Sequence, residues 1–555
     1  MRGAHAWLIL AVALLTASAP EPAPQPKPEP VAPVANACRR PAAGSTITDP
    51  PTIRSSNGVL TASFSFQTRT DARGRPLYCF MTPDGLQNPT LHLSPGDTLD
   101  VTVTNNTPRG MPMMKIDAPN CGSATMTSSS LNIHYHGTNV RPHCRGDEVI
   151  KTLVSPGETF RYRFAIPLDE PPGLYWYHAH VHGISERMVM GGATGALIVN
   201  GIEKMQPAAS GLGVRIFQIR DHKAAIGRNE GGGDCDLVKP PAVPFRDLSV
   251  NDVPNDSSLV GGKVVYASGK IFVRSGRREF WRIGNTSSDT ILDLRLLYDG
   301  VPQDFELAAI DGVPVNSQDG TGPGRTIKVQ RYRLPPAGRV EIIVTTPAST
   351  VRSAQLVTHG IDTGRDGDCA PRRPLFNIIV SPDAPEPTYR EGGPFPGTGR
   401  RFAGLAAAPV TARRTLFFAE HKETFFMTVA GQKNHAFDPN MPPAIVTRLG
   451  AVEQWTVQNR THESHEFHIH QIHFLVQSQD NFGKRPPAPG IVGQYLDTID
   501  IPAWDGSGPY PSVSLLMDFR GDIAGRFVFH CHILNHEDRG MMNIIEVRQA
   551  RAGAR

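Results

Sequence analysis

The chain has little charge and almost no imbalance of charge. Charged residues make up 19% of its 555 residues, and 56 Lys and Arg stand against 52 Asp and Glu, a formal net charge of +4. So small an excess predicts no basic face that would bind nucleic acid or another polyanion. Long apolar patterns of helical period are also lacking, and 50 prolines would interrupt them. With 53 glycines to form turns, the composition predicts many short strands and an all-β fold.

Long hydrophobic runs are scarce as well. One short run, from Ala6 to Ala17, follows Arg2 and His5. It is too short to span a membrane comfortably, and its basic start and small-residue end predict a secretory signal over residues 1–19. An uncleaved anchor is the alternative. Pro-rich residues 20–37 predict an extended tether. We therefore expect an exported protein, periplasmic or secreted, with no membrane span in its mature form.

Cysteine is rare, with seven in the whole chain. In an oxidising compartment six of them could pair and one would be left over. Cys531 is the one that stands apart, because histidines flank it on both sides. We predict a bridge between Cys121 and Cys144, although six cysteines allow many connectivities.

A sequence motif recurs three times along the chain, and we call it the recurring motif. Three segments start at a glycine, continue with alternating apolar residues and end at an asparagine: Gly96 to Asn105, Gly276 to Asn285, and Gly450 to Asn459. Their starts lie 180 and 174 residues apart, which is the length of a domain. The recurring motif predicts three related β domains, over residues 38–200, 201–400 and 401–555.

Ten of the 20 histidines lie in four short clusters. The clusters fall in the first and third predicted domains, and the corresponding part of the middle domain has no histidine. The middle domain is therefore predicted to space and orient the other two. The clustered histidines are His134, His136, His178, His180, His465, His468, His470, His530, His532 and His536.

The spacing within the clusters predicts two metal sites. Residues two apart on a strand face the same side, so each His-x-His pair offers two imidazoles to one site. The four pairs give eight imidazoles, too many for one ion. His465 and Cys531 fall at odd spacings and face the other way. Together with His536 and Met541 they form the ligand set of a blue-copper centre. A zinc hydrolase could explain one cluster, but it leaves Cys531, Met541 and most imidazoles unexplained.

With these motifs in this order, the chain resembles the three-domain multicopper oxidases, the laccase-like enzymes. The resemblance implies three cupredoxin-like domains, each a Greek-key β-sandwich or barrel, and four copper ions. It implies a blue copper on His465, Cys531 and His536, with Met541 as axial ligand, and a trinuclear cluster. In that cluster it assigns His134 and His468 to a lone copper. It assigns a coupled pair of coppers to His136, His178, His180, His470, His530 and His532.

The resemblance also implies the reaction. One-electron oxidation of a donor would be coupled to four-electron reduction of dioxygen to water. Phenols and aromatic amines are the expected donors and metal ions come next. Thioethers at Met111, Met113 and Met114 add cuprous ion as a candidate. The alternative is a copper-binding scaffold without turnover, which typically lacks cluster ligands. A copper nitrite reductase would have two domains. We expect a monomer.

Two acids are candidates for proton delivery. Glu537 directly follows His536 and matches an acidic position that the family uses for this purpose, and Asp147 is the second candidate. The competing interpretation is that both are solvated surface acids.

Overall fold

The computed structural model describes residues 37–549 except 73, 223–244, 261–262, 371, 388–394 and 484–487. The predicted signal and nearly all of the predicted tether lie outside the described residues, as does Cys235. None of the described helices is long and apolar enough to cross a membrane.

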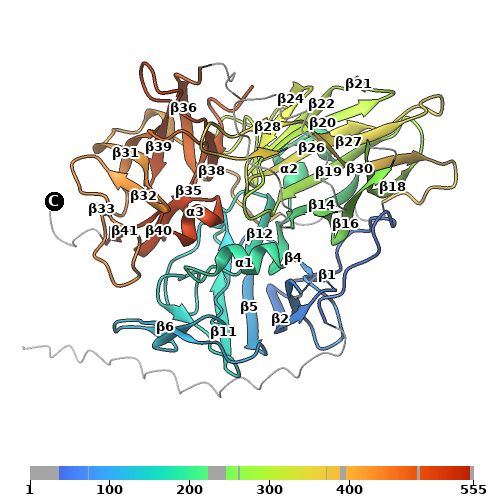
Figure 1. The fold of residues 1–555 in the computed structure, drawn as a ribbon. Coiled ribbons are helices and arrows are strands. Elements are labelled where there is room, and N and C mark those ends of the chain that lie inside the picture. Colours follow the sequence, from blue (N-terminus) through green and yellow to red (C-terminus); the bar gives the residue numbers. More distant parts are fainter. Residues whose placement is uncertain are drawn as a thin grey trace, which may run out of the picture.

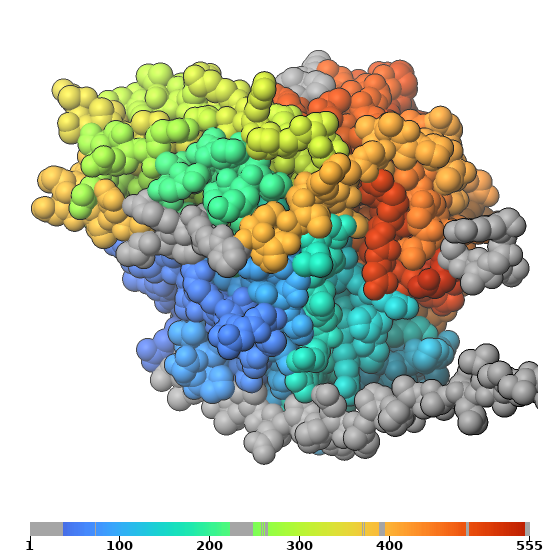
Figure 2. All heavy atoms as spheres, turned by 180° about the vertical axis from the view of Figure 1, so that it is seen from behind, coloured from blue at the N-terminus to red at the C-terminus, as the bar shows by residue number. Residues whose placement is uncertain are grey.

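The structure is almost entirely β, and three consecutive segments of the chain occupy three regions that meet one another (Figure 1). The view from behind shows the same three regions in contact (Figure 2). The prediction of an all-β fold is confirmed. The predicted domain limits stay a prediction, and two short helices, α2 (Ile202–Met205) and η1 (Pro207–Ala209), directly follow the first of them.

The first segment forms a five-stranded sheet, β1-β4-β13-β12-β9, and a four-stranded sheet, β11-β5-β2-β3. Its apolar side chains form one core. Two small ribbons, β10-β7 and β6-β8, lie outside these sheets. The elements are β1 (Thr52–Arg54), β2 (Val59–Thr70), β3 (Pro76–Met81), β4 (Thr90–Leu93), β5 (Thr98–Asn105), β6 (Pro112–Lys115), β7 (Cys121–Gly122), β8 (Thr125–Thr127), β9 (His134–His136), β10 (Thr152–Leu153), β11 (Thr159–Ala165), β12 (Gly173–His178), α1 (Ser185–Met190) and β13 (Thr194–Val199).

The second segment forms a nine-stranded sheet, β17-β16-β15-β14-β19-β26-β22-β23 with β24 on β22, and a six-stranded sheet, β18-β30-β27-β20-β21 with β25 on β20. The elements are α2 (Ile202–Met205), η1 (Pro207–Ala209), β14 (Gly213–Asp221), β15 (Phe245–Val250), β16 (Val253–Val260), β17 (Lys263–Ala267), β18 (Gly269–Val273), β19 (Arg278–Asn285), β20 (Leu292–Tyr298), β21 (Val301–Pro302), β22 (Phe305–Ile310), β23 (Val313–Pro314), β24 (Ile327–Val329), β25 (Tyr332–Leu334), β26 (Arg339–Thr345), β27 (Ala354–Thr358), β28 (Ile361–Asp362), β29 (Cys369–Ala370) and β30 (Arg373–Val380).

The third segment forms a six-stranded sheet, β32-β31-β34-β39-β36-β37, and a five-stranded sheet, β33-β41-β40-β35-β38. The elements are η3 (Leu405–Ala407), β31 (Ala412–His421), β32 (Thr424–Val429), β33 (Ile445–Arg448), β34 (Val452–Asn459), β35 (His465–Ile469), β36 (Phe474–Asp480), β37 (Tyr495–Leu496), β38 (Thr498–Ile501), β39 (Ser512–Asp518), β40 (Gly525–Cys531), α3 (Leu534–Asp538) and β41 (Met542–Arg548).

Each copy of the recurring motif forms a strand, and the three strands have the same arrangement of neighbouring strands. β5, β19 and β34 each pair with a parallel strand on one side and an antiparallel strand on the other. In each case the final asparagine is buried and donates through Nδ2 to main-chain carbonyls of nearby loops. The asparagine ends the strand by satisfying loop carbonyls that would otherwise be buried without donors.

The second and third copies also share a cluster of three side chains, in which the Trp and Glu are buried and the Arg is partly buried. Glu279 accepts a hydrogen bond from Trp281 Nε1 at 2.8 Å and one from Arg215 Nε at 2.7 Å. Glu453 accepts the corresponding bonds from Trp455 Nε1 at 2.9 Å and Arg414 Nε at 2.7 Å. The repeat therefore extends from the strand pattern to its polar contacts.

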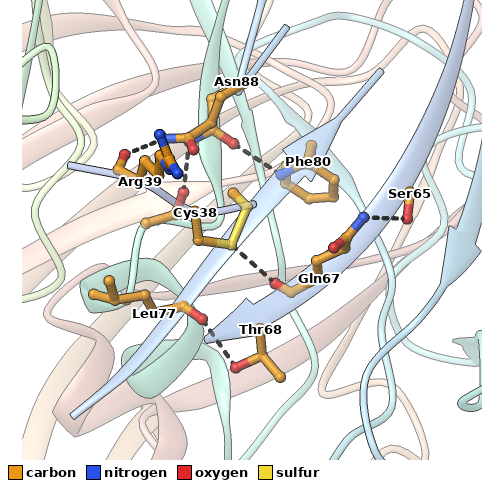
Figure 3. Close-up of a disulfide and its surroundings, with 12 residues drawn as sticks. Cys38, Arg39, Ser65, Gln67, Thr68, Leu77, Phe80 and Asn88 are labelled. Carbon is orange, nitrogen blue, oxygen red and sulfur yellow. Dashed lines mark hydrogen bonds between the residues drawn. A yellow bond between two sulfur atoms is a disulfide. The ribbon is translucent and has the colours of Figure 1, made fainter. Parts of the chain in front are cut away.

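Two disulfides are present in the first segment. Cys121 and Cys144 are bonded, which confirms the predicted bridge. Cys38 and Cys79 form a second bridge, which we did not predict. Figure 3 shows Cys38 beside β2 and β3, where its Sγ lies 3.4 Å from the Gln67 carbonyl oxygen. The Cys38–Cys79 disulfide joins the start of the described chain to β3, at the edge of the four-stranded sheet.

Candidate functional site

Strand register aligns the histidine clusters in pairs. β9 and β12 are antiparallel neighbours in which His134 lies opposite His178. β35 and β40 are also antiparallel, and there His468 lies opposite His530. The other member of each His-x-His pair is on the same side of the same strand or just beyond its end. Two sheets from distant parts of the chain therefore each present four imidazoles.

The two sets of imidazoles meet. The ring of His134 stacks on that of His470 with centroids 3.7 Å apart, and His136 stacks on His468 at 3.9 Å. His530 Nε2 lies 3.4 Å from His180 Nε2 and 3.2 Å from His470 Nε2. All eight predicted cluster residues are brought into one buried group, with exposed fractions of 2% or less.

His532 also contacts rings of both sheets. Its ring centroid lies 5.1 Å from that of His136 and 5.6 Å from that of His178. The eight rings thus form one continuous group, in which His180 and His470 lie against His530, His136 and His178 lie against His532, and His468 lies beside both.

The nitrogens in this group are oriented for metal binding. On His134, His136, His178 and His468, Nε2 is buried with no hydrogen-bond partner among the described residues. The Nδ1 atoms of the same rings contact polar groups outside the group, such as the Ala179 carbonyl at 3.0 Å from His178. Outer contacts on one nitrogen that leave the other free are typical of metal-ligating histidine. Burial also lowers the pKa of His178 to about 3 and that of His530 to about 4, so the rings are neutral and keep their lone pairs.

Cys531 lies on the opposite side of β40, as its odd spacing predicts. Its Sγ is 3.6 Å from His465 Nδ1 and 3.7 Å from His536 Nδ1, and the two Nδ1 atoms are 3.1 Å apart. Met541 is fully buried, and its main-chain oxygen accepts the Cys531 N–H at 3.0 Å. One thiolate and two imidazoles in this arrangement suit copper. Burial raises the pKa of the Cys531 thiol, so a cation is needed to hold it as thiolate.

Both predicted acids are buried, so they are not solvated surface groups. Asp147 Oδ1 lies 3.0 Å from His134 Nδ1 and accepts the Tyr135 N–H at 2.9 Å. Its Oδ2 accepts a bond from Gln471 at 2.6 Å. Glu537, on α3, has Oε2 at 3.2 Å from His530 Nδ1. Burial raises the pKa of Glu537, and the neighbouring carboxyl of Asp538 raises it further.

An acidic cavity lies beside His536. Its volume is about 810 Å³, and residues from all three segments line it. His536 is among them, and its Nε2 lies 3.4 Å from the carboxylate of Glu463. Carboxylates outnumber the cationic side chains Lys422 and Arg539 in the lining. They are Glu186, Asp221, Asp289, Asp366, Asp368, Glu420, Glu423 and Glu463.

The sequence did not predict these acids or the polar groups behind the imidazoles. Glu463 lies two residues before His465, and its proximity to the third histidine cluster was the one available signal. Asp497 and Arg339, which contact His136 from the other segments, belong to stretches with no repeated pattern.

Comparisons with known proteins agree with the resemblance seen in the sequence. Two family profiles described as multicopper oxidase match residues 124–204 and 410–551, which hold all four histidine clusters. A laccase of Haloferax volcanii is 25% identical over 84% of this chain and 74% of its own length. A laccase of Bacillus subtilis is 24% identical over 69% of this chain and 72% of its own length.

Solved structures show the same fold. The multicopper oxidase McoA from Aquifex aeolicus superposes with a TM-score of 0.64 at 18% identity, over 91% of this chain and 99% of that one. A multicopper oxidase from Campylobacter jejuni, described as a metallo-oxidase, gives 0.63 at 22% identity, over 92% of this chain and 96% of that one.

Proposed function

Because this chain belongs to the multicopper oxidases, we propose that it oxidises its donor one electron at a time and reduces dioxygen to water with four copper ions. The observation that carries this proposal is that the full set of candidate ligands is present and assembled. Eight buried imidazoles form one group, and Cys531 with two further imidazoles forms another.

The assignment of ligands follows the family resemblance, and the contacts between the rings are compatible with it. His465, Cys531 and His536, with Met541 as axial ligand, would hold the blue copper. His134 and His468 would hold the lone copper of the cluster. The set around His530, with His180 and His470, would hold one ion of the coupled pair, and the set around His532, with His136 and His178, the other.

Copper would supply the one-electron steps and the site of oxygen reduction. The chain supplies the connection between the two centres, because Cys531 lies between His530 and His532 in the sequence. A thiolate ligand of one centre is thus joined to two ligands of the other by a short bonded route. Glu537 and Asp147 would carry protons to the cluster, since each carboxylate contacts a cluster imidazole.

The acidic cavity favours a metal ion as donor over a neutral phenol. A donor must come close to a ligand of the blue copper, and His536 is the ligand that lines this cavity. Carboxylate and imidazole groups suit oxidisable divalent ions such as ferrous ion. The carboxylates of Glu420 and Glu463 lie within 4.8 Å of each other and of a ligand atom of His465, so an ion held by the two carboxylates would lie beside the blue-copper site. The negative electrostatic field of the cavity carboxylates also concentrates positively charged substrates.

Cuprous ion is the alternative donor. Met111 and Met113 are 76% and 46% exposed, and exposed thioethers can bind a soft ion. Met113 lies on β6, in the ribbon outside the main sheets, and Met111 directly precedes that strand.

Export to the periplasm or the cell exterior fits the two disulfides, which persist in oxidising compartments. We retain the proposal of a monomer.

Oxygen uptake by the copper-loaded protein tests the reaction. With 2,6-dimethoxyphenol or ferrous ion, we expect four donor molecules to be oxidised for each dioxygen consumed. Copper-free protein, measured in parallel, corrects for spontaneous oxidation of ferrous ion. Full copper binding without uptake of oxygen from either donor or from cuprous ion would instead favour the copper-binding scaffold.

Replacing Glu420 by glutamine tests the donor class. Removing one carboxylate from the cavity should raise the KM for ferrous ion about 10-fold, or about 1.4 kcal/mol, and leave the KM for the neutral phenol unchanged. Added salt should weaken the ferrous reaction in the parent protein more than in the variant. Steady-state oxygen uptake measures each value.

Asp480→Asn is the matched control. It removes one exposed carboxylate at the end of β36, outside the cavity lining, and should leave both KM values unchanged. If Glu420→Gln raised the KM for ferrous ion and the KM for phenol equally, the result would contradict a cation site in the cavity.

A further inference from the structure

Arg339 lies buried where the three segments meet. It starts β26 of the nine-stranded sheet and is fully inaccessible to solvent. Its Nε donates to the Leu174 carbonyl on β12 at 3.2 Å, and Nη1 donates to the carbonyl of Ala337 in its own segment at 3.0 Å. Its two η nitrogens donate to the carboxylate of Asp497 at 2.8 and 2.5 Å. A single guanidinium therefore bonds to all three segments.

Arg339 and Asp497 lie behind two of the cluster imidazoles. Arg339 Nη1 is 3.2 Å from His136 Nδ1. His468 Nδ1 donates to the main-chain oxygen of Asp497 at 2.8 Å. The Nε2 atoms of both histidines are buried without a partner among the described residues. The contacts thus fall on one nitrogen of each ring and leave the other free.

The contact to Asp497 selects a tautomer for His468. A carbonyl oxygen can only accept, so His468 Nδ1, at 2.8 Å from the main-chain oxygen of Asp497, carries the proton. For His136 the contacts fix the position of the ring, because Arg339 Nη1 lies 3.2 Å from its Nδ1. A neutral imidazole protonated on Nδ1 has its lone pair on Nε2, the form that binds a metal.

Asp311 holds the Arg339–Asp497 pair in place. Its Oδ1 accepts the Arg339 N–H at 2.9 Å. Its Oδ2 accepts the N–H groups of Asp497 and Thr498 at 3.2 and 3.1 Å. The carboxylate thus ties the start of β26 to the start of β38, and the Arg339–Asp497 pair cannot shift without breaking buried hydrogen bonds.

We propose that Arg339 is a positioning residue of the trinuclear cluster: with Asp497 and Asp311 it holds the His136 ring in the orientation that binds copper, and His468 in the orientation and tautomer that bind copper. The middle segment, which supplies no ligand, thereby controls ligands from both of the others. This inference rests on the proposed ligand set.

Arg339→Met tests the proposal. Loss of outer contacts to a ligating histidine weakens metal binding by about 10- to 100-fold. The lone copper is the ion of the cluster that has no magnetic partner, so its EPR signal can be compared with that of the blue copper in the same spectrum. We expect this ratio to fall, the copper content per chain to decrease, and the visible absorption of the thiolate-bound copper to remain.

Arg282→Met is the matched control. Arg282 is equally buried, on neighbouring strand β19, and its Nη1 lies 3.1 Å from Glu341 Oε1, while Glu341 Oε2 accepts the Leu174 N–H at 3.0 Å. Loss of this cation also disturbs the junction with Leu174, but away from His136 and His468. An unchanged EPR ratio in Arg339→Met, or an equal fall in Arg282→Met, overturns the proposal.

Arg339→Lys serves if the methionine variant does not fold. Lysine keeps the buried charge but cannot donate two parallel hydrogen bonds to Asp497. The ratio should fall here too, and a ratio like that of the parent protein overturns the proposal. A parent protein that binds copper but shows no lone-copper signal would instead contradict the proposed ligand set, so the two failures are distinguishable.

Discussion

Cys531→Ser should reduce oxygen uptake to the level of the copper-free protein. Serine has nearly the same size, but its hydroxyl does not supply the thiolate that a blue-copper centre requires. The sulfur forms a triangle with the Nδ1 atoms of His465 and His536, at 3.6 and 3.7 Å from them, and it is also the start of the bonded route to His530 and His532. Oxygen uptake with phenol and with ferrous ion, together with the visible spectrum, measures the change.

The lone-copper EPR signal is the control for this variant. The eight cluster imidazoles do not include Cys531, so this signal should persist while the blue absorption disappears. If the variant kept its oxygen uptake with either donor, electrons would reach the cluster without Cys531, and the proposed route would be wrong.

Glu537→Gln should lower oxygen turnover by roughly 100-fold, a typical effect of removing a proton-transferring group. Glutamine keeps the size of the side chain but carries no exchangeable acid proton. Because burial raises the pKa of Glu537, the group acts as an acid in its protonated form, and turnover in the parent protein should fall as pH rises through that pKa. In the variant, turnover should no longer show this decrease at alkaline pH, which we call the alkaline fall. Oxygen uptake from low to high pH measures it.

The rate at which the donor reduces the blue copper without oxygen separates electron delivery from proton delivery. It should be equal in the Glu537 variant and the parent. Asp538→Asn is the matched control on the same helix, because Asp538 accepts main-chain N–H groups of Gly183, Ser185 and Glu186 at 2.8, 3.1 and 2.9 Å. It should keep the alkaline fall but at lower pH, because loss of the Asp538 carboxyl lowers the pKa of Glu537. A pH profile of the Glu537 variant that overlays the parent's would rule out the proton-delivery role.

Much of the site could be predicted from the sequence because a strand has a simple period. Alternation places His530 and His532 on one side of β40 and Cys531 on the other, and the structure has this arrangement. The repeated strands β5, β19 and β34 were detectable for the same reason, since each combines alternating apolar residues with a fixed glycine and asparagine.

The surroundings of the site could not be predicted in this way. Arg339, Asp311 and Asp497 are single charged residues in unrelated stretches, and only the docking of three segments brings them to His136. The acidic cavity beside His536 also depends on three segments. The Cys38–Cys79 bond was not predicted because nothing in the local pattern distinguishes one pairing from another.

The middle copy of the repeat separates the architecture of this protein from its chemistry. It has the same strand setting as the third copy and the same polar contacts, with Trp281, Glu279 and Arg215 in place of Trp455, Glu453 and Arg414. Yet it contributes no histidine to either centre. The strand and its polar contacts therefore form in a segment without metal ligands, so this part of the architecture does not depend on copper.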